Sequence, residues 1–231
     1  MIPKKIEKAL SEYSDILLKE EKDVIKYANK LKRKMKDNKY YHLSNDKISE
    51  VSSVKQDKSW LSSIYYNPYG LWISCGSSWI DSCIKNKYLK WAGSKYLYEI
   101  EVNDNVKKIS NIREFKLFFK KYQNKKAKKF KDLINWKGIK KEYDGLIICP
   151  YLGTKIWKNK SAETSYGFYN EKVIKILEET FGKKLFNYDE FLYEWYRHWE
   201  VASGVIWNKE GIKNINLIYE KPVSTKIKPK P

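Results

Sequence analysis

The chain has 231 residues, of which 42% are hydrophobic and 16% are aromatic, so it holds enough apolar material for a buried core and is not globally disordered. Its net charge is +19, and only three of its 47 basic residues are arginine, which leaves 44 lysines. No run approaches the ~18 consecutive apolar residues of a membrane-spanning helix, so neither such a helix nor a membrane partner is expected.

The first 38 residues predict an N-terminal helical extension. Between residues 4 and 37, apolar side chains recur at roughly helical spacing, with lysine and glutamate between them. A short strand is expected at 40–44, followed by a helical turn at 47–51. Residues 52–69 are rich in serine, asparagine, tyrosine and proline, and this composition predicts a loop.

The rest of the chain alternates strand and helix patterns. No internal repeat is visible and the linkers are short, so we expect one α+β domain over 39–220 with a small mixed or antiparallel sheet. Residues 152–168 predict a loop, and 221–231 predict a flexible basic tail. Strands are predicted at 70–74, 95–102, 143–149, 201–207 and 215–219, and helices at 79–87, 112–122, 136–142, 170–181 and 188–198.

The lysine excess has two interpretations. It can attract nucleic acid or another polyanion, or it can reflect the coding bias of an AT-rich genome, which also enriches asparagine, isoleucine and tyrosine. The scarcity of arginine argues against specific base recognition, because bidentate guanine contacts use arginine more than lysine. The candidate polyanion contacts are the densest basic cluster, formed by Lys120, Lys121, Lys125, Lys126, Lys128, Lys129 and Lys131.

Several familiar sites are missing from the sequence. There is no P-loop, no GxGxxG and no GxSxG motif, which argues against a nucleotide-triphosphate hydrolase, a Rossmann enzyme and a serine hydrolase. There is no CxxC pair and only two distant histidines, so no metal is expected. An odd cysteine count without a signal peptide favours free thiols at Cys75, Cys83 and Cys149 and a cytoplasmic or otherwise intracellular, reducing compartment.

Polar residues stand in aromatic, strand-like surroundings at four places. His42 and Ser44 follow two tyrosines in the first strand; Gly70 to Ser74, with Trp79 beyond, forms the second. Asp144 opens a later strand, and Glu200 stands before the Val-Ala-Ser-Gly sequence that starts the next. Taken singly, each is explained as well by a structural role.

Taken in order over residues 40–208, these segments resemble the ADP-ribosyltransferase family, in its histidine-containing branch, and are also similar to NAD-dependent RNA 2′-phosphotransferases. The Tyr41–Ser44 segment resembles the first-strand histidine motif of the family, and Gly70–Ser74 with Trp79 resembles the second-strand segment. The late-strand acidic position falls at Glu200. The resemblance implies a split-sheet fold and NAD as the substrate, with no metal.

The resemblance also implies a role for each site residue. Glu200 stabilises the oxocarbenium-like cation that forms when the nicotinamide–ribose bond breaks, and it orients the acceptor. His42 holds the adenosine-side ribose through the hydroxyl groups of that sugar. Glu142, Asp144, Glu99 and Glu101 compete with Glu200 for the acidic role. The remaining NAD contacts are assigned to Tyr41, Ser44, Tyr66, Gly70, Leu71, Ser74, Trp79 and Ser203.

Two classes of function therefore remain open. The first is an NAD-dependent transferase that passes ADP-ribose to a protein or nucleic-acid acceptor. The second is a non-enzymatic protein, either associated with nucleic acid through its lysines or serving in assembly through its aromatic residues.

Overall fold

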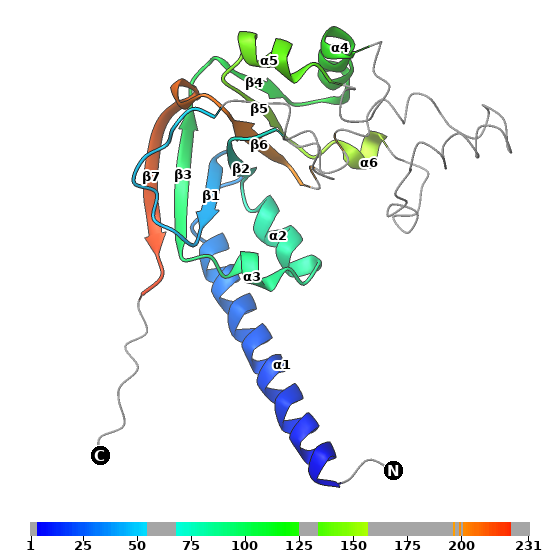
Figure 1. Ribbon diagram of the computed structural model, residues 1–231, viewed down its shortest axis with the longest axis vertical. Coiled ribbons are helices and arrows are strands. Elements are labelled where there is room, and N and C mark those ends of the chain that lie inside the picture. The colour runs from blue at the N-terminus through cyan, green and yellow to red at the C-terminus, as the bar shows by residue number, and fades with distance from the viewer. Residues whose placement is uncertain are drawn as a thin grey trace, which may run out of the picture.

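A computed structural model describes residues 4–54, 68–124, 134–156, 196, 199 and 201–222. Among these residues, no helix is both long enough and apolar enough to cross a membrane. The chain forms a mixed α+β structure around one sheet (Figure 1), which confirms the fold class expected from the sequence.

The sheet has seven strands in the order β4-β5-β6-β2-β1-β3-β7 (Figure 1). Neighbouring strands are antiparallel, except that β4 and β5 run parallel. All strands except β4 fall where apolar runs predicted them. The strands are β1 (Tyr40–Ser44), β2 (Leu71–Cys75), β3 (Tyr96–Val102), β4 (Val106–Ile109), β5 (Gly145–Ile148), β6 (Ser203–Ile206) and β7 (Ile212–Glu220).

The sheet is curled, and its inner face is packed with aliphatic side chains. Val106 of β4 and Ile212 of β7 belong to one apolar cluster, although these strands stand at opposite ends of the strand order. Ile73 of β2 and Ile206 of β6 are buried at its centre. The two ends of the sheet are therefore connected by the side chains of this inner core, in addition to the pairing of neighbouring strands between them.

Two groups of helices cover the other face. α1 (Lys4–Lys32), α2 (Ser78–Lys85) and α3 (Leu89–Ala92) pack on the β1 and β3 side, where Leu31, Ile80 and Tyr41 belong to one buried cluster. α4 (Ile112–Tyr122), α5 (Trp136–Glu142) and α6 (Gly153–Ile156) pack on the β5 and β6 side. The N-terminal part of α1 extends away from the sheet (Figure 1), and Ile16, Leu17 and Leu18 are exposed there.

Several expectations about local structure need correction. The helical turn predicted at 47–51 is wrong, because Ile48 N donates to the Tyr98 hydroxyl at 2.8 Å and the segment runs irregularly beside the sheet. Strand β4 and the short helices α3 and α6 were not predicted. The predicted helices at 170–181 and 188–198, apart from Tyr196, and the tail from 223 lie outside the described residues.

The cysteines also depart from expectation. Cys75 and Cys149 form a disulfide with a Cα–Cα distance of 6.4 Å, so the prediction that these two are thiols is wrong. Cys83 is buried in α2 and is not part of a disulfide. The bridge links the last residue of β2 to the residue after β5, and β6 lies between these two strands.

A lysine occupies the position that ends α2, where glycine is usually found. Lys87 has φ +59°, Tyr88 N donates to Cys83 O at 2.8 Å, and Lys87 N donates to Ile84 O at 3.3 Å. These two bonds form a Schellman motif, whose left-handed residue is usually glycine because a Cβ costs roughly 1–2 kcal/mol there. The structure therefore keeps a lysine at a conformational cost.

We expect Lys87→Gly to leave the free energy of unfolding unchanged or to raise it by up to about 1 kcal/mol, because relief of the left-handed strain offsets the extra entropy of an unfolded glycine. The substitution also removes the ion pair of Lys87 with Glu21, at 3.9 Å, which adds little because the lysine is exposed. Lys85→Gly is the matched control: Lys85 is the last helical residue of α2 and has no left-handed strain to relieve, so glycine there should cost up to about 1 kcal/mol. Urea unfolding checks both, and an equal loss in the two variants contradicts the assignment.

Candidate functional site

The site lies where two neighbouring strands part. β1 pairs with β3 over five residue pairs but with β2 over only two, Tyr40↔Cys75 and Tyr41↔Ser74. β2 continues beside β6 as far as Leu71, so the two strands separate beyond Tyr41 and Ser74. A pocket of about 380 Å³ is lined by residues on both sides of this parting, a size within the usual range for small-molecule sites.

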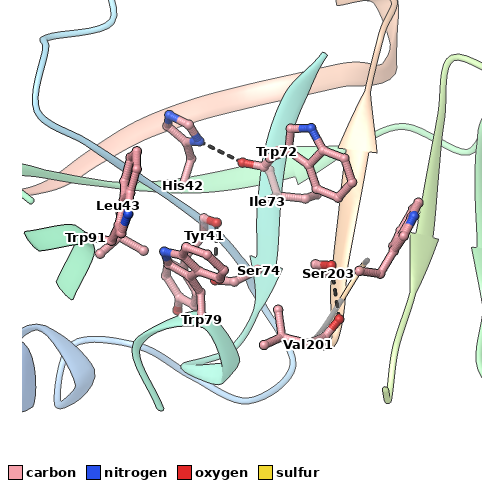
Figure 2. A pocket seen from close by; sticks show the side chains of 11 residues that line it. Tyr41, His42, Leu43, Trp72, Ile73, Ser74, Trp79, Trp91, Val201 and Ser203 are labelled. Carbon is pink, nitrogen blue, oxygen red and sulfur yellow. Dashed lines mark hydrogen bonds between the residues drawn. The ribbon is translucent and has the colours of Figure 1, made fainter. Parts of the chain in front are cut away.

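His42 lies in the gap between the parted strands. Its ring Nδ1 lies 2.7 Å from the carbonyl oxygen of Trp72, a group that no longer pairs across the ladder (Figure 2). Because a carbonyl only accepts, Nδ1 carries the proton and Nε2 is left as a hydrogen-bond acceptor. Burial lowers the pKa of His42, against the opposing effect of the hydrogen bond to Trp72, so the ring is neutral at pH 7.

Aromatic side chains make most of the pocket wall. Trp72 and Trp199 meet edge to face, with ring centroids 5.1 Å apart. In the view of Figure 2, Trp79 is seen with Tyr41 and Ser74 at the middle of the pocket, with Trp91 on one side and Ser203 on the other. Trp91 of α3 also lines the pocket and is 56% exposed, which places it at the mouth. The wall suits a flat ring.

The hydroxyl groups of the two pocket serines donate hydrogen bonds to backbone carbonyl oxygens. Ser74 Oγ donates to Gly76 O at 3.1 Å, and Ser203 Oγ donates to Val201 O at 3.1 Å. Both oxygens therefore keep only acceptor capacity, as does Nε2 of His42. These three polar side chains together present acceptors, so they favour a ligand that brings donors such as hydroxyl or amide N–H groups.

Hydrogen bonds connect residues 201–203, where β6 begins, to the end of β2 and the start of α2. The carbonyl oxygen of Ala202 accepts from Cys75 N at 3.0 Å and from Ser78 Oγ at 2.6 Å. These bonds fix Val201 and Ser203, on either side of Ala202, against the pocket.

The structure brings together five of the residues expected at the site. Tyr41, His42, Ser74, Trp79 and Ser203 come from three distant segments and line one pocket. The lining residues that sequence reasoning missed are Leu43, Trp72, Ile73, Trp91, Trp199 and Val201. Trp72 could have been found, because alternation along a strand puts it on the same face as Ser74.

Three further candidates do not line the pocket. Ser44 Oγ accepts from Asp46 N at 3.1 Å at the end of β1. Leu71 packs against the inner core, and Gly70 lies against the backbone of Ile206. Tyr66 and Glu200 lie outside the described residues, although the described neighbours of Glu200 in the sequence, Trp199 and Val201, both line the pocket.

The competing carboxylates have structural partners elsewhere. Buried Asp144 accepts from Asn105 Nδ2 at 2.8 Å and from Asn208 Nδ2 at 2.6 Å, and so ties two loops together. Glu142 pairs with Lys121, which lowers the pKa of Glu142. The pocket lining among the described residues holds no carboxylate.

The dense lysine cluster is only partly described. Lys120 is exposed, and Lys121 bonds Glu142 and lies 4.9 Å from the Tyr122 ring centroid. The bond to Glu142 raises the pKa of Lys121 well above its usual value. Lys125, Lys126, Lys128, Lys129 and Lys131 lie outside the described residues, so the expected polyanion contact there stays a prediction.

Within the part of the chain that the structure describes, no group of three histidine, cysteine, aspartate or glutamate side chains could hold a metal ion. No family model matches the chain, and neither curated proteins nor solved structures gave a match.

Proposed function

We propose that this chain is an ADP-ribosyltransferase-like protein that takes NAD as its substrate in the pocket between β1 and β2 and transfers ADP-ribose to a protein or nucleic-acid acceptor. One observation carries the proposal. His42, Ser74, Trp79 and Ser203, chosen from separate sequence segments for their resemblance to one family, lie around a single pocket.

The chemistry of the pocket fits part of the NAD molecule. Tryptophan rings offer stacking surfaces for the nicotinamide ring. Nε2 of His42 and the serine oxygens accept hydrogen bonds, and the donors that NAD brings are the ribose hydroxyls and the carboxamide N–H groups. This role requires a neutral His42, and the lowered pKa of His42 keeps the ring neutral at physiological pH.

The reaction proposed is a substitution at the ribose carbon that bears nicotinamide. The bond to the nicotinamide nitrogen breaks and its electron pair leaves with nicotinamide, while an acceptor oxygen or nitrogen forms the new bond and releases a proton. A carboxylate beside this carbon stabilises the developing positive charge and takes the proton. We assign this role to Glu200, on the sequence resemblance alone.

The test follows binding and turnover separately. Because four tryptophans line the pocket, NAD should quench the intrinsic fluorescence of the wild-type protein on titration. Labelled NAD should be consumed with release of nicotinamide, and Glu200→Gln should lower that rate about 100- to 10,000-fold while NAD still binds. Glu210→Gln, at an exposed glutamate of the turn before β7, is the matched control and should change neither measurement.

A wild-type protein that neither binds nor consumes NAD contradicts the proposal. Binding without turnover contradicts only the transferase part and leaves an NAD-binding protein. A Glu200→Gln variant that turns over NAD at the wild-type rate moves the acidic role to another residue.

A further inference from the structure

The segment from residue 82 to residue 98 joins a basic surface to the mouth of the pocket. It contains no aspartate or glutamate, and its four lysines, Lys85, Lys87, Lys90 and Lys95, are all exposed. Two aromatic side chains stand among them, Tyr88 at 43% exposure and Trp91 at 56%. Trp91 lines the pocket as well, so this surface and the pocket share a residue.

A second group of lysines gathers on two tyrosines. Lys30 Nζ of α1 and Lys34 Nζ, in the turn after α1, lie 5.2 Å and 5.4 Å from the ring centroid of Tyr219, and Lys221 Nζ lies 4.5 Å from that of Tyr27. The rings of Tyr27 and Tyr219 are 6.0 Å apart. Three ammonium groups, from α1, from the turn after it and from the residue after β7, therefore lie close to one aromatic pair.

The two groups of lysines are contiguous. The Tyr27 hydroxyl donates to Ser94 O at 2.8 Å, and Lys221 N donates to Lys95 O at 2.8 Å. The chain next to Trp91 is thus bonded directly to the residues beneath the second group. We call the whole the lysine–tryptophan surface; it consists of Lys30, Lys34, Lys85, Lys87, Lys90, Trp91, Lys95 and Lys221.

Gathering like charges in this way is unfavourable where no carboxylate lies close; Lys87 has one, Glu21, at 3.9 Å. Lys30 and Lys34 place their ammonium groups near the same Tyr219 ring, so their like charges repel, and Lys221 adds a third charge nearby. A polyanion that lies along the surface removes the repulsion and releases its own condensed counterions. An exposed indole beside a row of lysines is the arrangement that binds unpaired bases, because any base can stack on it.

We infer that the lysine–tryptophan surface binds single-stranded nucleic acid, with phosphates along its lysines and a base stacked on Trp91 at the mouth of the pocket. The inference rests on the proposed function in one respect: with NAD in the pocket, the strand on Trp91 is the acceptor. The binding itself requires no NAD and is measured without it. Lysine in place of arginine predicts tolerance of sequence.

The experiment uses the full chain and fluorescent 20-nucleotide probes: oligo(dT), oligo(U) and a DNA duplex of equal length. Trp91→Ala should weaken binding of the single strands about tenfold or more and leave duplex binding unchanged, because paired bases cannot stack on the indole. Lys90→Gln combined with Lys95→Gln should make the salt dependence of single-strand binding shallower, by a slope of about 1.4 for two lost phosphate contacts. The two single-stranded probes separate DNA from RNA.

Matched controls separate this surface from the general positive charge. Leu117→Ala removes an apolar side chain that is 58% exposed on α4, and Lys137→Gln with Lys141→Gln removes two exposed lysines of α5. Neither control should reproduce the effects. If the α5 variant matches the Lys90 and Lys95 variant, or if Trp91→Ala weakens single strands and duplex equally, the inference is overturned. Normal NAD binding with no nucleic-acid binding also overturns it and leaves protein as the acceptor.

Discussion

Replacing His42 with alanine is expected to abolish measurable NAD binding and to lower the free energy of unfolding by about 1–3 kcal/mol. The substitution removes the Nε2 acceptor from the pocket and also leaves the Trp72 carbonyl without its 2.7 Å partner. A partly buried acceptor that loses its hydrogen-bond partner costs about 1–3 kcal/mol, which sets the stability loss. Fluorescence titration with NAD and urea unfolding measure the two effects separately.

His42→Asn is the control that divides these roles. The asparagine amide nitrogen can take the place of Nδ1 and donate to Trp72 O, while nothing replaces Nε2. Stability should therefore stay within about 1 kcal/mol of the wild type while NAD affinity falls as in the alanine variant. If His42→Asn binds NAD like the wild type, then His42 serves the fold alone.

The same residue sets an expected pH dependence. Because burial lowers the pKa of His42, NAD binding should persist from neutral pH to below the ordinary histidine value of about 6.5 and weaken only when Nε2 gains a proton. The unfolded chain binds that proton more readily than the folded one. The free energy of unfolding should therefore fall as the pH drops through about 6.5 and level off below the lowered pKa. In His42→Asn this component of the pH profile should be missing.

Replacing Gly70 with alanine is expected to cost roughly 3–5 kcal/mol of the free energy of unfolding, a large part of the total for a domain of this kind. Gly70 has φ +152°, a conformation that side chains rarely adopt, and an added Cβ would lie 2.2 Å from Ile206 O and 2.9 Å from Val205 Cγ2. The obstacle is mainly the backbone of β6, which cannot rotate aside. Thermal or urea unfolding should show the loss directly.

Gly93→Ala is the matched control. Gly93 has φ −90°, and the nearest atom to its added Cβ is Leu89 O at 3.5 Å, an ordinary contact. Its unfolding midpoint should stay close to that of the wild type. A Gly70→Ala protein of wild-type stability would show that β2 does not approach β6 as closely as described, and the ligand role suggested for Gly70 by the sequence would return.

Local sequence patterns predicted most strands of the sheet. The runs that became β1, β2, β3, β5, β6 and β7 combine apolar or aromatic residues with turn residues at their ends, and this signal is enough for single strands. β4 was not predicted, because its sequence, Val-Lys-Lys-Ile, has two lysines between its two buried residues. Lysines on an edge strand protect it from pairing with another chain, and in the sequence they look like a loop.

The sequence could predict only those site residues that lie in recognisable strands. His42 and Ser74 stand in recognisable strands, so their neighbourhood could be proposed from order along the chain. Trp91 reaches the pocket because α2 and α3 pack beside the sheet, and the four residues of α3 are too few for a helical pattern. The disulfide of Cys75 and Cys149 joins residues 74 apart and leaves no local trace in the sequence.

The short ladder between β1 and β2 has a mechanical consequence. Only two residue pairs fasten these strands on the pocket side, while the inner core joins both ends of the sheet from behind. The pocket therefore lies where the two parts of the sheet are least joined by strand pairing. A ligand that contacts both His42 of β1 and Ser203 of β6 connects the strands on the two sides of the pocket. Its binding free energy therefore adds to the stability of the folded sheet.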